Sequence, residues 1–214
     1  MMTKQGRFIV VEGLEGAGKS TAIQTIKRYL ENHVPNVLLT REPGGTRVGE
    51  MIRTIIKEEV DGEILDSRAE LLLLYAARVQ LVEQVIRPAL NQGYWVLADR
   101  FELSTFAYQG GGRHLDEDMI STLSTFCLRG FKPDLIFFLD IEPEQGLNRV
   151  RQRGASDRME QESLLFFTNV YNSYQRMIKA MNNVVCIDAS QPMNIVQQSI
   201  ITQLETFIAH NASV

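Results

Sequence analysis

The sequence has 214 residues, enough for one globular domain with its own core. Hydrophobic residues make up 44% and charged residues 22%, which is ordinary folded-protein composition and excludes a disordered or fibrous chain. The net charge is −4, so no overall positive field favours nucleic acid as a partner.

The two cysteines, Cys127 and Cys186, lie far apart, each in an apolar run and outside any metal-binding spacing. We expect two buried, reduced thiols. The first residues lead into a strand-like run rather than a signal peptide, and no apolar stretch approaches the roughly 18 residues of a membrane span. The sequence therefore predicts a cytoplasmic protein without a membrane partner.

Short apolar runs alternate with segments of helical spacing along the chain. The runs predict strands at residues 8–11, 37–40, 95–99, 135–140 and 184–188. Helices are predicted near residues 21–30, 51–56, 66–91, 116–128 and 193–208, with further helices flanking an arginine-rich stretch at 149–158. We expect Pro88 to kink or shorten the last turn of the long helix and residues 109–113 to form a loop. Strands alternating with helices predict a parallel sheet between layers of helices, in one domain.

The first predicted strand runs into a phosphate-binding loop, GLEGAGKS at residues 13–20. The glycines let backbone N–H groups surround phosphates, and the following helix N-terminus adds positive potential. Lys19 is expected to reach the β- and γ-phosphates of ATP, and the Ser20 hydroxyl to ligate Mg²⁺. The expected ATP-binding set is Gly13, Leu14, Glu15, Gly16, Ala17, Gly18, Lys19, Ser20 and Thr21. The alternative is a glycine-rich turn without function.

Glu15 is unexpected in this loop, because a carboxylate near a triphosphate repels it by roughly 4 kcal/mol at contact distance. It makes sense if it points toward a hydroxyl of a second substrate. The alternative is a solvated side chain.

Five blocks in order resemble the thymidylate kinase family, closest to its bacterial members: VEGLEGAGKS (11–20), TREPGGT (40–46), DRF (99–101), AYQG (107–110) and DRME (157–160). The resemblance covers nearly the whole chain. It implies an α/β, P-loop nucleoside-monophosphate-kinase-like three-layer fold with a five-stranded parallel sheet, as a single domain over residues 1–214. It also implies transfer of the γ-phosphate of ATP to dTMP, giving dTDP and ADP in dTTP biosynthesis, with Mg²⁺. In the family the bond before the proline of the second block is usually cis, which here is Pro43.

Asp99 and Arg100 follow a strand end, the usual ligand position in an α/β sheet. Asp99 could order Mg²⁺ or its waters, so the metal set is Ser20 and Asp99. The alternative is an internal ion pair between Asp99 and Arg100. The resemblance places Arg100 and Arg53 on the dTMP phosphate.

The rest of the acceptor site also comes from the resemblance. It assigns Arg78 and Gln109 to the thymine edge with Thr105 beside them, Tyr108 to the sugar 2′ position, and Glu15 to the 3′ hydroxyl. Many relatives stack a phenylalanine on the base where this chain has Leu74, and Tyr75 points about 100° away around the helix. The expected dTMP-binding set is Glu15, Arg53, Leu74, Arg78, Arg100, Thr105, Tyr108 and Gln109.

The stretch around Gly154 carries Arg149, Arg151, Arg153 and Arg158, and we expect a lid at residues 143–160 that excludes water from the reaction. The alternative is a solvated basic helix face. The expected catalytic residues are Lys19, Asp99, Arg100 and Arg153.

Phosphoryl transfer to an anionic phosphate needs positioning and charge neutralisation rather than a strong base. His33, His114 and His210 lie in polar surroundings and are expected to face solvent. One rival is a nucleoside kinase, with Glu15 or Glu42 as base. Another is a nucleotide switch or ATPase, although the Asn-Lys-x-Asp motif of GTPases is absent from the sequence.

The resemblance implies a homodimer. Its surface could come from the apolar side of the long helix, residues 71–74 with Leu81, Val82, Val85 and Ile86, although these could equally be core.

Overall fold

The fold is described from a computed structural model, over residues 6–58, 63–154 and 158–212. Five strands form one parallel sheet in the order β2-β3-β1-β4-β5. Their bounds are β1 (Phe8–Gly13), β2 (Val37–Arg41), β3 (Trp95–Asp99), β4 (Leu135–Asp140) and β5 (Val184–Asp188). The central strands β1, β3 and β4 are almost wholly buried, as continuous apolar runs predict for strands covered on both faces.

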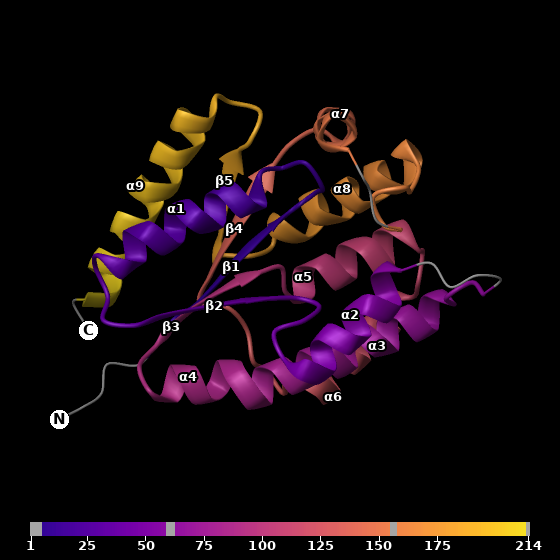
Figure 1. Ribbon diagram of the computed structural model, residues 1–214, viewed down its shortest axis with the longest axis horizontal. Helices are drawn as coiled ribbons and strands as arrows, with labels where there is room; N and C mark the ends of the chain where they lie inside the picture. Colours follow the sequence, from indigo (N-terminus) through magenta and orange to yellow (C-terminus); the bar gives the residue numbers. More distant parts are fainter. Residues whose placement is uncertain (1–5, 59–62, 155–157, 213–214) are drawn as a thin grey trace.

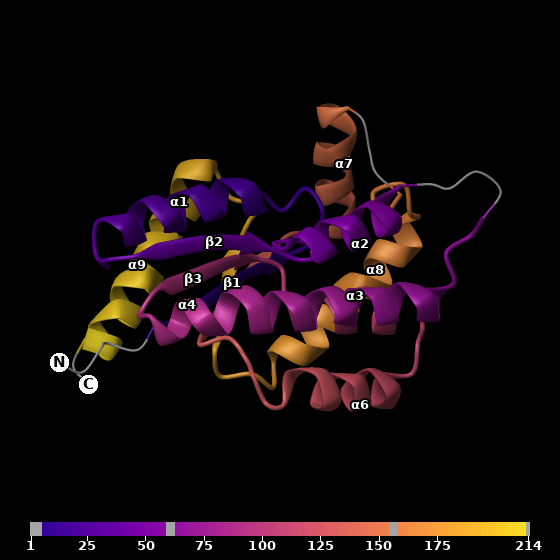
Figure 2. The same ribbon diagram turned by 60° about the horizontal axis from the view of Figure 1, so that its bottom comes forward.

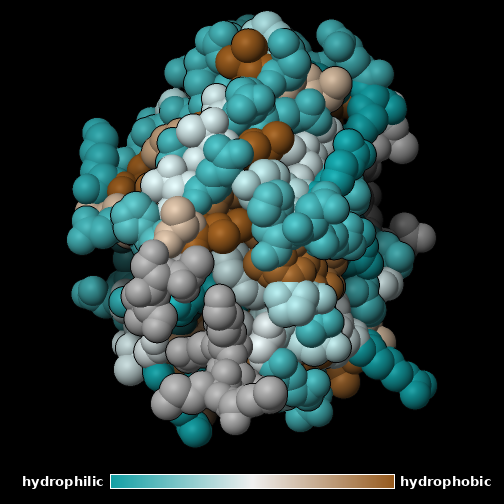
Figure 3. Space-filling model, turned by 90° about the vertical axis from the view of Figure 1, so that its left-hand side faces the viewer, coloured by the Kyte–Doolittle hydropathy of each residue, from teal (hydrophilic) through white to brown (hydrophobic). Residues whose placement is uncertain are grey.

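The helices lie on both faces of the sheet, which confirms the three-layer α/β fold (Figures 1 and 2). α1 (Lys19–Glu31) and α9 (Met193–Ala212) cover one face, and the other is covered mainly by α3 (Ser67–Leu81), α4 (Arg87–Asn91) and α8 (Leu164–Ile178). The remaining helical segments are α2 (Arg47–Lys57), η1 (Val82–Ile86), α5 (Glu102–Thr105), η2 (Phe106–Gly112), α6 (Glu117–Leu128) and α7 (Pro143–Arg153). The end of the molecule away from α2 and α7 shows mostly hydrophilic side chains with separate hydrophobic patches (Figure 3).

Helix starts follow local chemistry. Side-chain oxygens of Thr46, Asp66, Asp116 and Ser163 accept hydrogen bonds from backbone N–H groups in the first turns of α2, α3, α6 and α8. Such caps satisfy donors that the first turn leaves without partners.

The long helix predicted for residues 66–91 is three consecutive segments, α3, η1 and α4, which follow one line without a sharp kink (Figure 2). Pro88 lies in α4, and the wide π-helical turn η1 precedes it. Proline has no N–H to donate to the preceding turn, and a wider turn absorbs this change in hydrogen bonding. The last turn reaches Asn91, so the expectation that Pro88 kinks or shortens it was wrong.

The predicted loop at residues 109–113 was also wrong, because residues 106–112 form the π-helix η2. The glycines there serve close packing rather than a turn. A Cβ added to Gly111 would lie 2.6 Å from the Cβ of Ser173, and one on Gly112 would lie 2.5 Å from the ring of Phe166. Both partners belong to α8, so these glycines let η2 approach that helix.

Two further expectations changed in detail. Cys127 is half-buried and Cys186 is exposed on the edge strand β5, so the expected burial of both thiols was wrong, although neither forms a disulfide.

The apolar residues of the long helix were considered either as a dimer surface or as core. Of these, Leu81, Val82 and Ile86 are core residues, whereas Leu72 is 57% exposed. His33, His114 and His210 are exposed, as expected. No helix in the described part of the chain is long and apolar enough to cross a membrane.

Candidate active site

The predicted phosphate-binding loop connects β1 to α1. Gly13, Gly16 and Gly18 have φ values of 143°, 74° and 89°, which side-chain-bearing residues rarely adopt. Lys19 folds back over the loop, and its Nζ donates to the carbonyl oxygens of Gly13 (3.1 Å) and Leu14 (2.7 Å). Burial lowers the pKa of Lys19 to about 8, and Arg100 adds to this. Lys19 therefore presents a partly desolvated positive charge to an anion bound at the loop.

The loop is held against α7 by a contact between two glycines. A Cβ on Gly16 would lie 2.1 Å from the carbonyl oxygen of Gly146, and a Cβ on Gly146 would lie 2.5 Å from that of Glu15. Neither position tolerates a side chain without movement of the backbone. Gly146 was missed by sequence reasoning, because its partner lies far away in the sequence.

A cavity of about 450 Å³ lies at the carboxyl ends of the strands, bordered by the loop, α2, α3, η2 and α7. Most predicted site residues line it: Glu15, Gly16, Gly18, Lys19, Ser20, Thr21, Arg53, Leu74, Arg78, Asp99, Arg100, Thr105, Tyr108, Gln109 and Arg153. Gly13, Leu14 and Ala17 are buried behind this lining. The carboxyl ends of parallel strands are the common ligand position in such folds.

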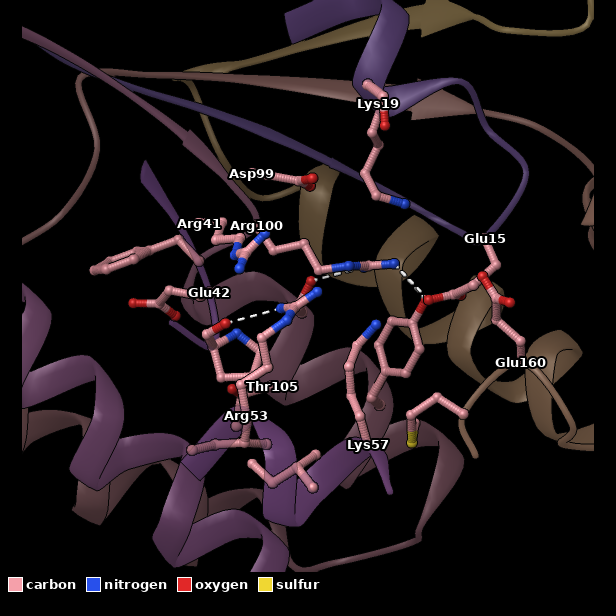
Figure 4. A pocket seen from close by; sticks show the side chains of 18 of the residues that line it. Glu15, Lys19, Arg41, Glu42, Arg53, Lys57, Asp99, Arg100, Thr105 and Glu160 are labelled. Atoms are coloured by element: carbon pink, nitrogen blue, oxygen red, sulfur yellow. Dashed lines mark hydrogen bonds and ion pairs between the residues drawn. The ribbon is translucent and has the colours of Figure 1, made fainter. Parts of the chain in front are cut away.

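Arg100 occupies the middle of the cavity (Figure 4). Its Nη2 lies 2.6 Å from Oε1 of Glu15 and 3.1 Å from the hydroxyl of Tyr108, which also donates to Glu15. Burial opposes the charge of Glu15, but Arg100 and Lys19 outweigh it and hold the pKa of this carboxyl below its ordinary value. Glu15 is thus a partly enclosed acceptor directed into the cavity, and the alternative of a solvated side chain was wrong.

Sequence reasoning missed Glu12, the buried carboxylate that supports Arg100. Arg100 has φ 67°, a left-handed conformation. Oε1 of Glu12 accepts the backbone N–H of Phe101 (2.9 Å), the residue after Arg100, and that of Ser104 (3.2 Å), four residues after Arg100. Its Oε2 accepts from the Ser104 hydroxyl at 2.6 Å, and burial raises its pKa although Arg100 opposes this. A charged residue inside an otherwise apolar strand was the available signal.

Asp99 does not pair with Arg100, which binds Glu15 instead, so the ion-pair alternative was wrong. One carboxylate oxygen of Asp99, Oδ1, is buried and has no hydrogen-bond partner. Asp99 and Lys19 point into the same part of the cavity, which Ser20 also lines (Figure 4). Two oxygen ligands, one of them a carboxylate oxygen without a hydrogen-bond partner, fit a hard divalent cation that takes its other ligands from phosphate and water.

Arg78 lies at the other end of the cavity and is 2% exposed. Its Nε lies 2.7 Å from Oε2 of Glu42, its Nη2 donates to the Thr105 hydroxyl at 2.8 Å, and its guanidinium packs over the rings of Tyr75 and Phe101. Burial raises the pKa of Glu42 to about 7, although Arg78 opposes the shift. Nη1 of Arg78 is buried without a partner, so it remains a donor for a ligand.

The other residues discussed for the acceptor side of the cavity also have defined positions. The Glu42–Pro43 peptide bond is cis, as predicted, and Nη1 of Arg53 donates to the Pro43 carbonyl at 2.8 Å. Leu74 lines the cavity, whereas Tyr75 is buried elsewhere, with its hydroxyl 3.0 Å from Glu102. Tyr75 therefore points away from the cavity, as the helical spacing predicted.

The arginine-rich stretch includes α7, whose Arg149 and Arg153 line the cavity. Nη1 of Arg149 donates to the carbonyl of Ala189 at 3.0 Å, and Arg153 forms an ion pair with Glu160. Ala155, Ser156 and Asp157 lie outside the described residues. Sequence reasoning missed several cavity-lining residues, whose roles depend on tertiary contacts: Lys57, Glu70, Met159 and Glu160.

Comparisons with known proteins all identify the same family. The family model described as thymidylate kinase matches residues 11–200. A protein named thymidylate kinase from Legionella pneumophila strain Corby is 54% identical over 211 residues, which cover 99% of this chain and all of that protein. The thymidylate kinase of strain Paris matches with the same identity and coverage.

Proposed function

Because the chain belongs to the thymidylate kinase family, we propose that the cavity lined by Arg100 holds ATP and dTMP end to end. The chain is a dTMP kinase, which transfers the γ-phosphate of ATP to dTMP and yields dTDP and ADP for dTTP biosynthesis. The observation that carries the proposal is the position of Arg100, between the phosphate-binding loop and the buried Arg78, with its guanidinium on Glu15.

The donor nucleotide occupies the phosphate-binding loop and the start of α1. Backbone N–H groups of the loop, the N-terminal end of α1 and Lys19 bind the phosphates of ATP. Anion binding replaces the two carbonyl contacts of Lys19 and favours its charged form, which burial disfavours.

The acceptor dTMP extends from Arg100 toward Arg78. Arg53 and Arg100 bind its phosphate, and Glu15 accepts the 3′ hydroxyl, beside Tyr108 at the 2′ position. Nη1 of Arg78 donates to a thymine carbonyl, with Gln109 and Thr105 along the base edge and Leu74 on its face.

The transfer itself is in line, from one phosphate oxygen to another. The acceptor oxygen is already anionic, so no general base is needed, and positioning and charge neutralisation carry the rate. Lys19 and Arg100 supply fixed positive charge, and Arg153 adds to it from α7. Asp99, the fourth proposed catalytic residue, would order Mg²⁺ or its waters beside the phosphates.

We also propose that Mg²⁺ accompanies ATP, with Ser20 and Asp99 as its protein ligands. The Oδ1 atom of Asp99, buried without a partner, supports this. When bound, the ion neutralises charge on the phosphate oxygens.

Residues 1–214 form one kinase domain in this proposal, and residues 143–160 act as its lid. Two contacts support the lid: α7 touches the phosphate-binding loop through Gly146, and Arg158 reaches Glu70 and the Ile56 carbonyl across the cavity. Closure would exclude water, the competing acceptor.

Three proposals concern the surroundings of the enzyme. It works in the cytoplasm, and nucleic acid and membranes are not its partners. It forms a homodimer. Leu72 on α3 and Phe126 on the adjacent α6 are 57% and 75% exposed, and dimerisation would cover them.

The direct test is ADP release measured in a coupled assay, with dTMP, thymidine and the other nucleoside monophosphates as acceptors. We expect ATP consumption to require dTMP, with thymidine inert. Equal ATP consumption without any acceptor would indicate an ATPase, and a preference for thymidine would indicate a nucleoside kinase.

A further inference from the structure

Glu70 is a carboxylate that the proposed reaction does not use, yet it is only 1% exposed at the edge of the cavity. It lies on α3 two turns before Arg78, on the same face of the helix. Its Oε1 accepts from Nε2 of Gln109 at 2.8 Å and lies 3.5 Å from Nε of Arg113. Its Oε2 accepts from Arg158. One buried carboxylate thus joins α3, η2 and the end of the proposed lid.

The chemistry of this contact fixes the orientation of the Gln109 amide. A glutamine side chain ends in an NH₂ donor and a carbonyl acceptor of nearly equal size, so it can be reversed. A carboxylate only accepts hydrogen bonds, so Glu70 holds the NH₂ group toward itself. Arg113 and Arg158 pair its charge. The amide oxygen is then the atom that Gln109 can offer to a ligand.

A pyrimidine edge meets two protein groups of defined polarity at this end of the cavity. Nη1 of Arg78 is a donor without a partner, and the Gln109 oxygen is an acceptor. Thymine presents a carbonyl oxygen next to an N–H, which complements a donor beside an acceptor. Cytosine presents an amino group next to a bare ring nitrogen, which opposes both. A site built on hydrogen bonds rejects a mismatched ligand because buried polar groups lose their partners.

We propose that Glu70 is a positioning residue that sets the base specificity of this enzyme, by holding the Gln109 amide in the orientation that accepts from thymine N3–H and not from cytosine. The proposal rests on the proposed function, since it assumes that the base lies between Arg78 and Gln109. Glu70 itself need not touch the nucleotide. It acts through Gln109.

The test compares Glu70→Gln with the wild-type enzyme. A glutamine at position 70 can donate or accept, so Gln109 is free to reverse. We expect the ratio of the dissociation constants of dCMP and dTMP, measured by titration calorimetry, to fall about tenfold, the effect of one hydrogen bond of about 1.4 kcal/mol. Arg78 stays a donor, so discrimination falls without being abolished.

Glu162→Gln is the matched control. Glu162 also pairs with Arg113 but has no hydrogen bond to Gln109 among the described contacts, so its loss should leave the ratio unchanged. Glu70→Gln could fold poorly because it removes the carboxylate that pairs with Arg158. The charge-balanced variant Glu70→Gln/Arg158→Gln removes one carboxylate and one guanidinium together, and we expect the same fall in the ratio.

An unchanged ratio in a folded Glu70 variant that still binds dTMP would overturn the proposal. Failure of the proposed function gives a different result: the wild-type enzyme itself would not prefer dTMP to dCMP, or Arg78→Met would bind dTMP normally.

Discussion

Replacing Lys19 with alanine is expected to lower kcat for dTMP phosphorylation by about 10²- to 10³-fold, the usual effect of removing one fixed group that stabilises charge in a transition state. Nζ of Lys19 is half-buried over the phosphate-binding loop, near Asp99 (Figure 4). Steady-state ADP release measures the effect. Because burial disfavours the lysine charge in the folded protein, we expect little loss of thermal stability.

Lys27→Ala is the control for this substitution. Lys27 lies on the same helix, α1, and forms an exposed ion pair with Glu31, four residues away. Such pairs contribute only about 0.3–0.5 kcal/mol, so activity should stay near that of the wild type. If Lys19→Ala kept at least a third of the wild-type kcat, the proposed role of Lys19 in charge stabilisation would be refuted.

Replacing Arg78 with methionine is expected to lower the free energy of unfolding by about 3–5 kcal/mol at pH 8, because it leaves Glu42 buried without its partner. The pKa of Glu42 is already raised to about 7 by burial, and without Arg78 it rises further. The folded state then binds a proton that the unfolded state has released, so this part of the stability falls as the pH rises. The variant should therefore lose less at pH 6 than at pH 8, in chemical denaturation at both values.

A second substitution separates stability from binding. Arg78→Met/Glu42→Gln removes the unpaired charge, so most of the lost stability should return. Binding of dTMP should stay weak, because the Nη1 donor of Arg78 is still missing. Recovery of normal dTMP affinity in the double variant would show that Arg78 supports the fold and does not read the base.

The parts of the site that the sequence predicted have local causes. The phosphate-binding loop was recognisable because its glycines, Lys19 and Ser20 lie within one short segment between a strand and a helix. The central strands were recognisable as apolar runs because both of their faces are covered. The assignment of Arg78 and Leu74 to the ligand site came from the family resemblance, and both residues line the cavity.

The parts that the sequence did not predict depend on distant partners. Glu12 holds the N–H of Phe101, 89 positions away, and Glu70 accepts from Gln109, 39 positions away. No local pattern marks such pairs. The run of glycines at 110–112 indicated a loop for the same reason, since the α8 side chains that require small residues there come more than fifty positions later.

A crystal structure of the protein soaked with dTMP and a non-hydrolysable ATP analogue would judge the arrangement of the two nucleotides most directly. We predict the triphosphate within the loop at residues 13–20 and the thymine beside Arg78, with the two terminal phosphates facing each other at Arg100. Thymidine monophosphate bound elsewhere, or a crevice at Arg78 and Arg100 that takes up no nucleotide from the soak, would contradict it.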